Sequence, residues 1–227
     1  MTQATNFLGN IRSKNSWTQE EMANILGVSR PTYNAMEKGE TSPTLEQINK
    51  LANKIGCEPK DILTEGIFDE AKYKEVLLET IRHGADSDGK ITKTKLAKLI
   101  YLNDFAWYYQ HLEPMTGAKY RRLPLGPVPD IFFAKVEELI NDGTLNLELK
   151  NDKSQMISLS RAGEMSKTKI LNPDEIKLIN NVSQKWQGRR TEEIVKFTHE
   201  QLPYKICTPG EVIPYELITQ QESEYVY

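Results

Sequence analysis

Residues 29–38 of this 227-residue chain concentrate side chains that donate hydrogen bonds. Arg30 carries a guanidinium that can donate two parallel hydrogen bonds, Asn34 an amide that can donate and accept, and Lys38 a point charge that can pair with an anion. These side chains can act together only if they project from one exposed helix. The chemistry therefore depends on the elements in which these residues stand.

The surrounding sequence predicts short helices with clear start and stop signals. Thr18-Gln19-Glu20-Glu21 fits a capping box, and Gly27 suits the end of the helix that follows it. Ser29 can cap the next helix, in which Pro31 is tolerated because first-turn amides lack partners anyway. A second capping box, Thr44–Gln47, opens a further helix. Two short helices separated by Gly-Val-Ser fit a helix-turn-helix.

The stretch Phe7–Leu63 resembles the helix-turn-helix of the Cro/C1-type (XRE) repressors of bacteria and phages. The resemblance rests on Gln19 opening the first helix, the small Ala23, the turn at Gly27, and Glu37-Lys38-Gly39 at the end of the second helix. A generic helical hairpin is the alternative, and it does not account for this spacing.

This resemblance implies that the second helix of the pair enters the major groove, and that the protein binds a palindromic operator as a homodimer. For each polar residue taken alone, a solvated surface position is the alternative. Pro31 and Ala35 stand where relatives are often polar, so the operator sequence is not predicted. The DNA-binding residues implied in this way are Gln19, which matches the position that holds the DNA backbone, together with Ser29, Arg30, Thr32, Asn34 and Lys38.

From about Tyr73 the sequence predicts longer elements. Thr92–Leu112 is apolar over much of its circumference, which is typical of a helix that is buried on several sides or binds a partner. Lysines cluster at its start, where we expect a solvated face, with a binding site as the alternative. Residues 115–129 predict an extended run stiffened by Pro and Gly. The other expected elements are helices at 130–141, 172–188 and 191–202 and a β-hairpin at 145–159.

Motifs in this second region resemble the Panacea domain of SocA-like and GepA-like antitoxins. They are Lys98-Leu99-Ile100-Tyr101-Leu102-Asn103-Asp104-Phe105, the ordered pair Thr116–Tyr120 and Gly126–Pro129, and Phe197-Thr198-His199. The resemblance spans roughly Tyr73–Ile218. Members of this family neutralise quite different toxins of bacterial type II toxin–antitoxin pairs, many carry an N-terminal helix-turn-helix, and one relative is a proteolytic adaptor. The resemblance therefore implies a DNA-binding antitoxin.

Residues 120–127 have the composition of a protein-binding surface. Tyrosine and arginine dominate interface hot spots, and a loop ordered in advance by Pro and Gly loses little entropy on binding. The alternative is that the motif residues, such as Tyr101, only maintain the fold. The residues expected to contact a toxin are Tyr120, Arg121, Arg122, Leu125 and Pro127.

The sequence predicts no enzyme, cofactor or metal site. His83, His111 and His199 lack ligand spacing, and phosphate-loop and nucleophile motifs are absent, so we expect His199 to be a hydrogen-bonded structural histidine. Cys57 and Cys207 are far apart, which favours two reduced thiols in the cytoplasm. No apolar stretch approaches the ~18–20 residues of a membrane span. The net charge of −3 leaves DNA binding to a local patch.

These patterns together predict a mainly α protein with a small β-hairpin. A five-helix XRE helix-turn-helix domain (1–65) and a linker (66–72) precede a larger α+β Panacea domain (73–227). The function that follows is a cytoplasmic antitoxin that represses its own operon and binds a toxin encoded by an adjacent gene. The alternatives are a stand-alone repressor, whose second domain senses a ligand or oligomerises, and a proteolytic adaptor.

Overall fold

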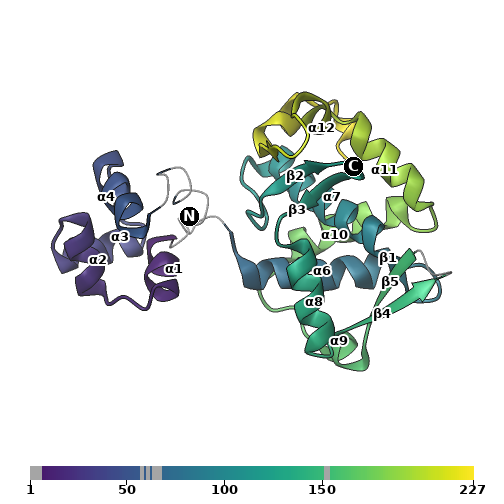
Figure 1. Ribbon diagram of the computed structural model, residues 1–227, viewed down its shortest axis with the longest axis horizontal. Coiled ribbons are helices and arrows are strands. Elements are labelled where there is room, and N and C mark those ends of the chain that lie inside the picture. The colour runs from purple at the N-terminus through teal and green to yellow at the C-terminus, as the bar shows by residue number, and fades with distance from the viewer. Residues whose placement is uncertain (1–6, 57–58, 60–61, 63–67, 151–153) are drawn as a thin grey trace. The chain divides into compact units, whose positions relative to one another are not determined.

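The chain divides into two compact units, Met1–Asp69 and Glu70–Tyr227. The computed structural model describes residues 7–56, 59, 62, 68–150 and 154–227 (Figure 1). The expected linker and the end of the expected five-helix domain fall partly outside these residues. Among the residues described in the first unit, the bounded helices are α1 (Phe7–Lys14), α2 (Gln19–Leu26), α3 (Arg30–Glu37) and α4 (Leu45–Ile55).

Side-chain caps define the helices of the first unit. Thr18 and Thr44 each form the expected capping box, in which the threonine hydroxyl accepts a hydrogen bond from a backbone N–H of the first turn. In return, the side chains of Glu21 and Gln47 accept from the N–H of the capping residue. Gly27 ends α2 in the left-handed conformation at a φ of 71°, where a residue with a Cβ is strained. The chain can therefore turn sharply from α2 into α3.

The helices of the first unit meet in one apolar core. The Tyr33 side chain of α3 is fully buried, and its hydroxyl donates to the carbonyl oxygen of Leu8 in α1 at 3.3 Å. Burial, together with the nearby Glu37, raises the pKa of the Tyr33 phenol to about 12. The buried core residues are Leu8, Ile11, Met22, Ala23, Leu26, Tyr33, Ile48, Leu51, Ala52 and Ile62.

The second unit is built around one long buried helix, α7 (Lys93–His111). Every residue of α7 from 95 to 107 is buried. Helices α6 (Glu70–Gly84), α10 (Pro173–Trp186) and α11 (Thr191–Glu200) pack around it, so the expected burial on several sides is confirmed. The remaining helices of this unit are α8 (Phe132–Asn141), α9 (Arg161–Met165), α12 (Leu202–Ile206), η1 (Tyr215–Gln220) and η2 (Ser223–Tyr225).

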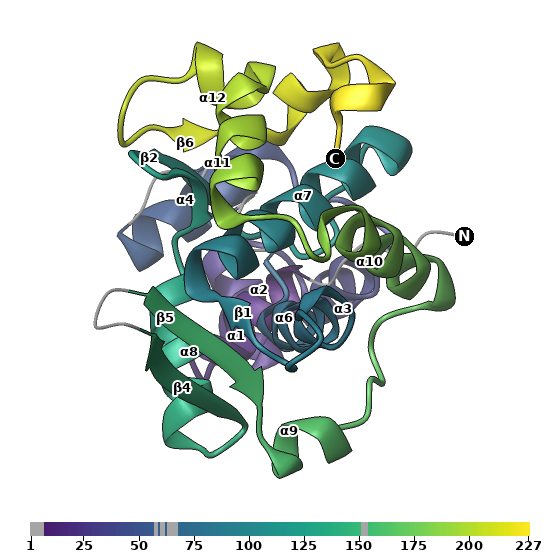
Figure 2. The same cartoon turned by 90° about the vertical axis from the view of Figure 1, so that its right-hand side faces the viewer.

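Two small antiparallel sheets lie at different ends of this unit (Figures 1 and 2). One has the strand order β1-β5-β4 and contains the hairpin expected at 145–159. The other has the order β3-β2-β6. The strands are β1 (Ile91–Thr92), β2 (Tyr120–Leu123), β3 (Gly126–Pro129), β4 (Leu145–Lys150), β5 (Ser154–Leu159) and β6 (Val212–Ile213). The mainly helical fold with small antiparallel sheets is therefore confirmed.

The β2–β3 hairpin corrects the extended run expected at 115–129. Its strands pair from Tyr120 opposite Pro129 to Leu123 opposite Gly126, and Gly126 has a φ of 100°. Within sheets, proline is confined to edge strands, strand starts and bulges. Because β3 is the edge strand of its sheet, its two prolines remove no hydrogen bond that an inner strand needs.

Pro203 has a double role that the sequence did not reveal. It follows the end of α11, as expected, but it also lies in the first turn of α12. Proline fits there because it has no N–H to leave without a partner. The chain therefore continues as helix after a sharp change of direction.

Candidate functional site

The polar residues of α3 lie together on the outside of the first unit. Ser29 caps α3, since its Oγ accepts from the N–H of Thr32 at 3.3 Å and lies 2.8 Å from the Thr32 hydroxyl. Arg30 is exposed at the first helical position and forms no ion pair with any residue that the structure describes. Asn34 is half-buried one turn further on, and Lys38 is exposed at the C-cap. The arrangement suits major-groove recognition, and the DNA contacts themselves stay a prediction.

Gln19 is held by a carboxylate whose role the sequence did not reveal. Its amide Nε2 donates to Glu37 Oε2 at 2.7 Å, and Arg12 Nε donates to Glu37 Oε1 at 3.0 Å. The bridge fixes the Gln19 amide and leaves its second N–H able to donate to a phosphate. Glu37 stood out only as part of a helix stop signal, because its two partners lie 18 and 25 residues away in the sequence.

The Panacea motif residues of the second unit meet in a buried network around Asp104. Its carboxylate accepts hydrogen bonds from the Thr116 N–H at 2.8 Å, from the Thr116 hydroxyl, from the Tyr120 hydroxyl at 2.8 Å and from the Tyr215 hydroxyl at 3.0 Å. Burial raises the pKa of Asp104, while these hydrogen bonds oppose the rise. Sequence reasoning missed Tyr215, which lies 111 residues from Asp104. The network links α7, β2 and η1 through one buried carboxylate.

The residues expected to contact a toxin separate into buried and exposed positions. Tyr120 and Pro127 are buried, so they support the β2–β3 hairpin from inside and present no surface to a partner. Arg122 is half-buried, with its guanidinium carbon 4.7 Å from the centroid of the Tyr204 ring. The exposed members are Arg121 and Leu125. Toxin contact by the accessible residues stays a prediction.

Two lysines at the start of α7 contradict the solvated face that we expected there. Lys95 and Lys98 are both buried, because α7 is enclosed by other elements even at its polar positions. Lys95 Nζ donates to the carbonyl oxygen of Arg189 at 3.0 Å and lies 3.5 Å from a carboxylate oxygen of Asp86. Lys98 Nζ donates to the carbonyl oxygen of Pro127 at 2.8 Å, and burial lowers its pKa to about 7.

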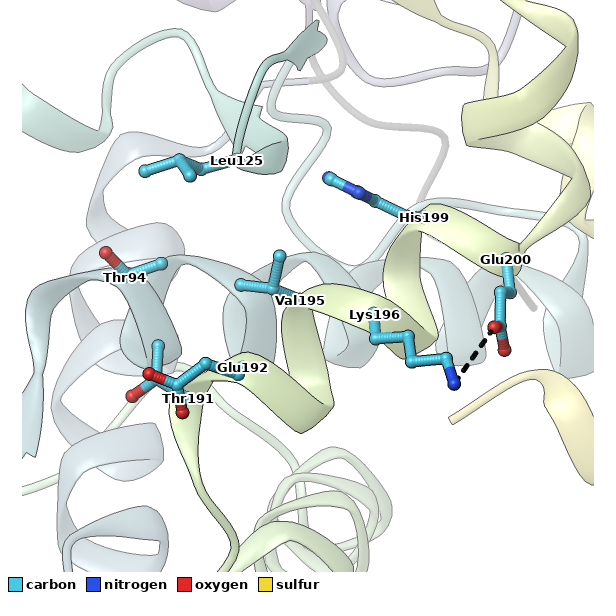
Figure 3. Close-up of a pocket in the computed structure, with 8 residues that line it drawn as sticks. All are labelled: Thr94, Leu125, Thr191, Glu192, Val195, Lys196, His199 and Glu200. Carbon is cyan, nitrogen blue, oxygen red and sulfur yellow. Dashed lines mark ion pairs between the residues drawn. The ribbon is translucent and has the colours of Figure 1, made fainter.

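A shallow pocket of about 490 Å³ opens between α11 and the β2–β3 turn (Figure 3). Leu125 lies across the pocket from Val195 and His199. The lining residues are Thr94, Leu125, Thr191, Glu192, Val195, Lys196, His199 and Glu200. The pocket is therefore bounded by the exposed tip of the hairpin.

His199 corrects the expectation of a hydrogen-bonded structural histidine. Its ring stacks on Tyr204 with the two centroids 4.4 Å apart, and its Nε2 is buried with no hydrogen-bond partner among the described residues. Burial lowers the pKa of His199, and the positive charges of Lys98 and Arg122 lower it further. The residue is therefore held by stacking and not by a hydrogen bond at Nε2.

Within the described ranges, none of the helices combines the length and the apolar character needed to cross a membrane. Nor do His, Cys, Asp and Glu side chains of these residues gather in a group that could hold a metal ion. Cys207 is a buried free thiol, and Cys57 lies outside the described residues.

Comparison with known proteins gives a separate match for each part of the chain. Residues 8–62 match the helix-turn-helix family, and residues 96–204 match the family of the antitoxin SocA-like Panacea domain. The predicted architecture is therefore confirmed. Both are families of regulatory or antitoxin domains and not of enzymes. Among solved structures there is no significant match.

Several curated regulators are similar to the first part of the chain. The SPbeta prophage-derived uncharacterized HTH-type transcriptional regulator YonR of Bacillus subtilis is 29% identical over 90 residues, which are 40% of this chain and 82% of that protein. The cryptic phage CTXphi transcriptional repressor RstR of Vibrio cholerae is 35% identical over 31% of this chain and 67% of its own length. An uncharacterized HTH-type regulator of Archaeoglobus fulgidus is 39% identical over 28% of this chain and 86% of its own length. The chain thus belongs to the helix-turn-helix transcriptional regulators, and it carries a SocA-like Panacea domain after its DNA-binding domain.

Proposed function

We propose that this chain is the antitoxin of a bacterial type II toxin–antitoxin pair. The Panacea domain binds and blocks a toxin encoded by an adjacent gene. The helix-turn-helix unit binds a palindromic operator as a homodimer and represses the operon of the pair. The observation that carries this proposal is the presence, in one chain, of an exposed helix-turn-helix surface and an antitoxin-type domain with a rigid, exposed hairpin tip.

The DNA part of the proposal is supported by the geometry of α3. Its first turn presents Ser29, Arg30 and Thr32 to the outside, and its orphan amides favour phosphate contact. Arg30 reads guanine in the major groove, while Gln19, fixed by Glu37, donates to the backbone. The positive charge available to DNA comes from this surface and not from the chain as a whole, whose net charge is −3.

The toxin part of the proposal is supported by the tip of the β2–β3 hairpin. Leu125 is 61% exposed at the tip, while the strands beneath it are held by the buried Tyr120 and Pro127. Further down β2, Arg121 is anchored by an ion pair with Asp130 at 2.8 Å. A large apolar side chain on a pre-ordered turn loses little entropy when it enters a partner's pocket.

The test is co-expression of the full chain with the product of the adjacent gene in a bacterial host. We expect the neighbouring protein alone to arrest growth and the full chain to restore it. Leu125→Asp should abolish both rescue and binding while leaving the melting temperature unchanged. Leu149→Asp is the matched control, because Leu149 is similarly exposed, at 65%, but lies on β4 of the other sheet.

The alternatives give different results in the same experiment. A neighbouring protein that is harmless, or that the full chain neither binds nor neutralises, would show that the antitoxin function is wrong. Retained operator binding would then leave a stand-alone repressor. A proteolytic adaptor would instead lower the amount of the neighbouring protein, and this loss would disappear in a host that lacks the protease.

A further inference from the structure

Two basic side chains, Lys98 and His199, meet at Gly126, at the base of the β2–β3 hairpin tip, and a third, Arg122, lies next to His199. A Cβ placed on Gly126 would lie 2.8 Å from Lys98 Cε and 3.3 Å from His199 Cδ2. Arg122 packs on the ring of Tyr204, on which His199 also stacks. We call Lys98, Arg122 and His199 the cationic cluster.

The cationic cluster has no carboxylate partner. Among the described residues, Lys98 donates only to a backbone carbonyl, and neither Nε of Arg122 nor Nε2 of His199 has a hydrogen-bond partner. Other buried cations of the unit are paired: Lys95 lies 3.5 Å from Asp86, and Lys135 lies 2.5 Å from both Glu70 and Glu138. The lack of an anion is therefore particular to this cluster.

Such an arrangement is costly for the isolated domain. A buried cation without a counter-ion loses its hydration with no compensating attraction, and in proteins such groups are normally paired. Burial lowers the pKa of both Lys98 and His199, as expected when the charged forms lack a partner. Unpaired groups of this kind concentrate where a protein binds something.

The pocket beside the cluster limits what the missing anion is. His199 and the apolar side chain of Val195 line the pocket from α11, and Leu125 lies across from them (Figure 3). Glu192 and Glu200 stand on the same lining, and Glu200 is already paired with Lys196, so they repel a multiply charged phosphate or a nucleic-acid backbone more strongly than a single carboxylate. A single carboxylate on an apolar segment fits both features.

We propose that an Asp or Glu side chain of the toxin docks in this pocket, next to an apolar residue, and supplies the carboxylate that the cationic cluster lacks. The carboxylate accepts a hydrogen bond from the His199 ring, and Lys98 and Arg122 stabilise its charge. This inference rests on the proposed function, because it names the chemistry by which the hairpin tip recognises the toxin.

The first experiment measures the affinity of the full chain for the product of the adjacent gene by calorimetry. Lys98→Met, Arg122→Gln and His199→Gln should each weaken binding about 10-fold or more, as removal of one member of a desolvated charge pair does. Lys90→Met is the control, since Lys90 is a lysine outside the pocket lining that is already paired with Glu148 at 2.5 Å, and it should change affinity less than about twofold. If Lys98→Met fails to fold, Arg122→Gln and His199→Gln carry the test.

A charge scan of the toxin then identifies the carboxylate. One Asp→Asn or Glu→Gln change should weaken binding as much as the cluster variants do, and its combination with His199→Gln should be less than additive. Cluster variants that bind with wild-type affinity, while Leu125→Asp does not bind, would overturn this inference and leave the antitoxin function standing.

A second experiment does not depend on the toxin. The His199 ring resonances of the full chain are followed by NMR during titration with acetate, phosphate and chloride. We expect a saturable shift with acetate that is absent in Lys98→Met and much weaker with phosphate. Equal responses to phosphate and acetate, or no saturable response to acetate, would contradict a carboxylate site even if the wild-type chain proved to bind no toxin.

Discussion

The two units of this chain differ in how many of their charged side chains are buried. Among the described residues of the first unit, Glu37 is the one buried charged group, and the residues expected to touch DNA lie on or near the surface. In the second unit, Lys95, Lys98 and Asp104 are buried within the central helix itself. The residues expected from the helix-turn-helix motif thus lie at or near the surface of the first unit, whereas the Panacea motif residues of α7 lie in the interior of the second.

The difference agrees with what we propose each unit to recognise. A helix that enters the major groove displays its contacts directly, so the functional residues can be read along one helix. A hairpin that binds a protein needs a fixed shape, and in the second unit that shape is set by hydrogen bonds beneath the surface. Motif residues such as Tyr120 and Asp104 therefore act by positioning the tip that carries Leu125.

The largest expected effect tests whether the two units work separately. A fragment of residues 70–227, which corresponds to the second compact unit, should lose all operator binding and still rescue growth from the toxin. Gel-shift titration and growth rescue measure the two activities. A fragment that is folded but gives no rescue would mean that the neutralising surface includes the first unit.

The next effect tests the buried network. Asp104→Ala leaves the hydroxyl and N–H of Thr116 without this acceptor, while the Tyr120 and Tyr215 hydroxyls each keep a backbone carbonyl, and we expect it to destabilise the second unit by about 2–3 kcal/mol. The control Asp130→Ala removes only an exposed ion pair and should cost under about 1 kcal/mol. Urea unfolding followed by hydrogen exchange of peptides from each unit gives both values. Equal effects of the two changes would show that the buried network does not stabilise the second unit more than an exposed ion pair does.

The pH dependence of the free energy of unfolding tests the burial of Lys98. Its folded-state pKa is about 7, below the ordinary value of 10.5, so between these values the unfolded chain binds the proton more tightly. The stability of the second unit should therefore rise with pH from about 7 to about 10.5, by an amount on the order of a few kcal/mol, and Lys98→Met should lack this rise. Urea midpoints across this range measure it. Parallel profiles for the wild type and Lys98→Met would show that Lys98 keeps an ordinary pKa.

The smallest effect tests the exposed surface of the first unit. Arg30→Ala should weaken operator binding by about 1–3 kcal/mol and relax the preference at one base, as loss of a bidentate contact does, without changing stability. Gln19→Ala should weaken binding evenly across sequences. Gel-shift titrations on the upstream region, with single-base variants of it, separate the two patterns. Wild-type affinity for both variants would remove these residues from the DNA surface.

Local signals in the sequence determined most of the first unit. Two capping boxes, the Gly27 turn and the Ser29 cap were all predicted and are all present, because each depends on residues within a few positions of one another. The same locality explains why the long α7 helix and the β4–β5 hairpin were predicted. Hydrophobic periodicity needs no knowledge of distant partners.

Only the tertiary structure decided what the motif residues of the second unit do. Tyr215 and Thr116 meet Asp104 across long stretches of chain, and Lys98 is enclosed by elements that the sequence places far from it. Whether a lysine on a helix faces water or a closed core depends on which elements pack against that helix. The residues next to the lysine in the sequence do not determine this. Sequence therefore fixes helices, caps and turns, which arise from short-range hydrogen bonds, while burial and pairing of charges arise from long-range packing.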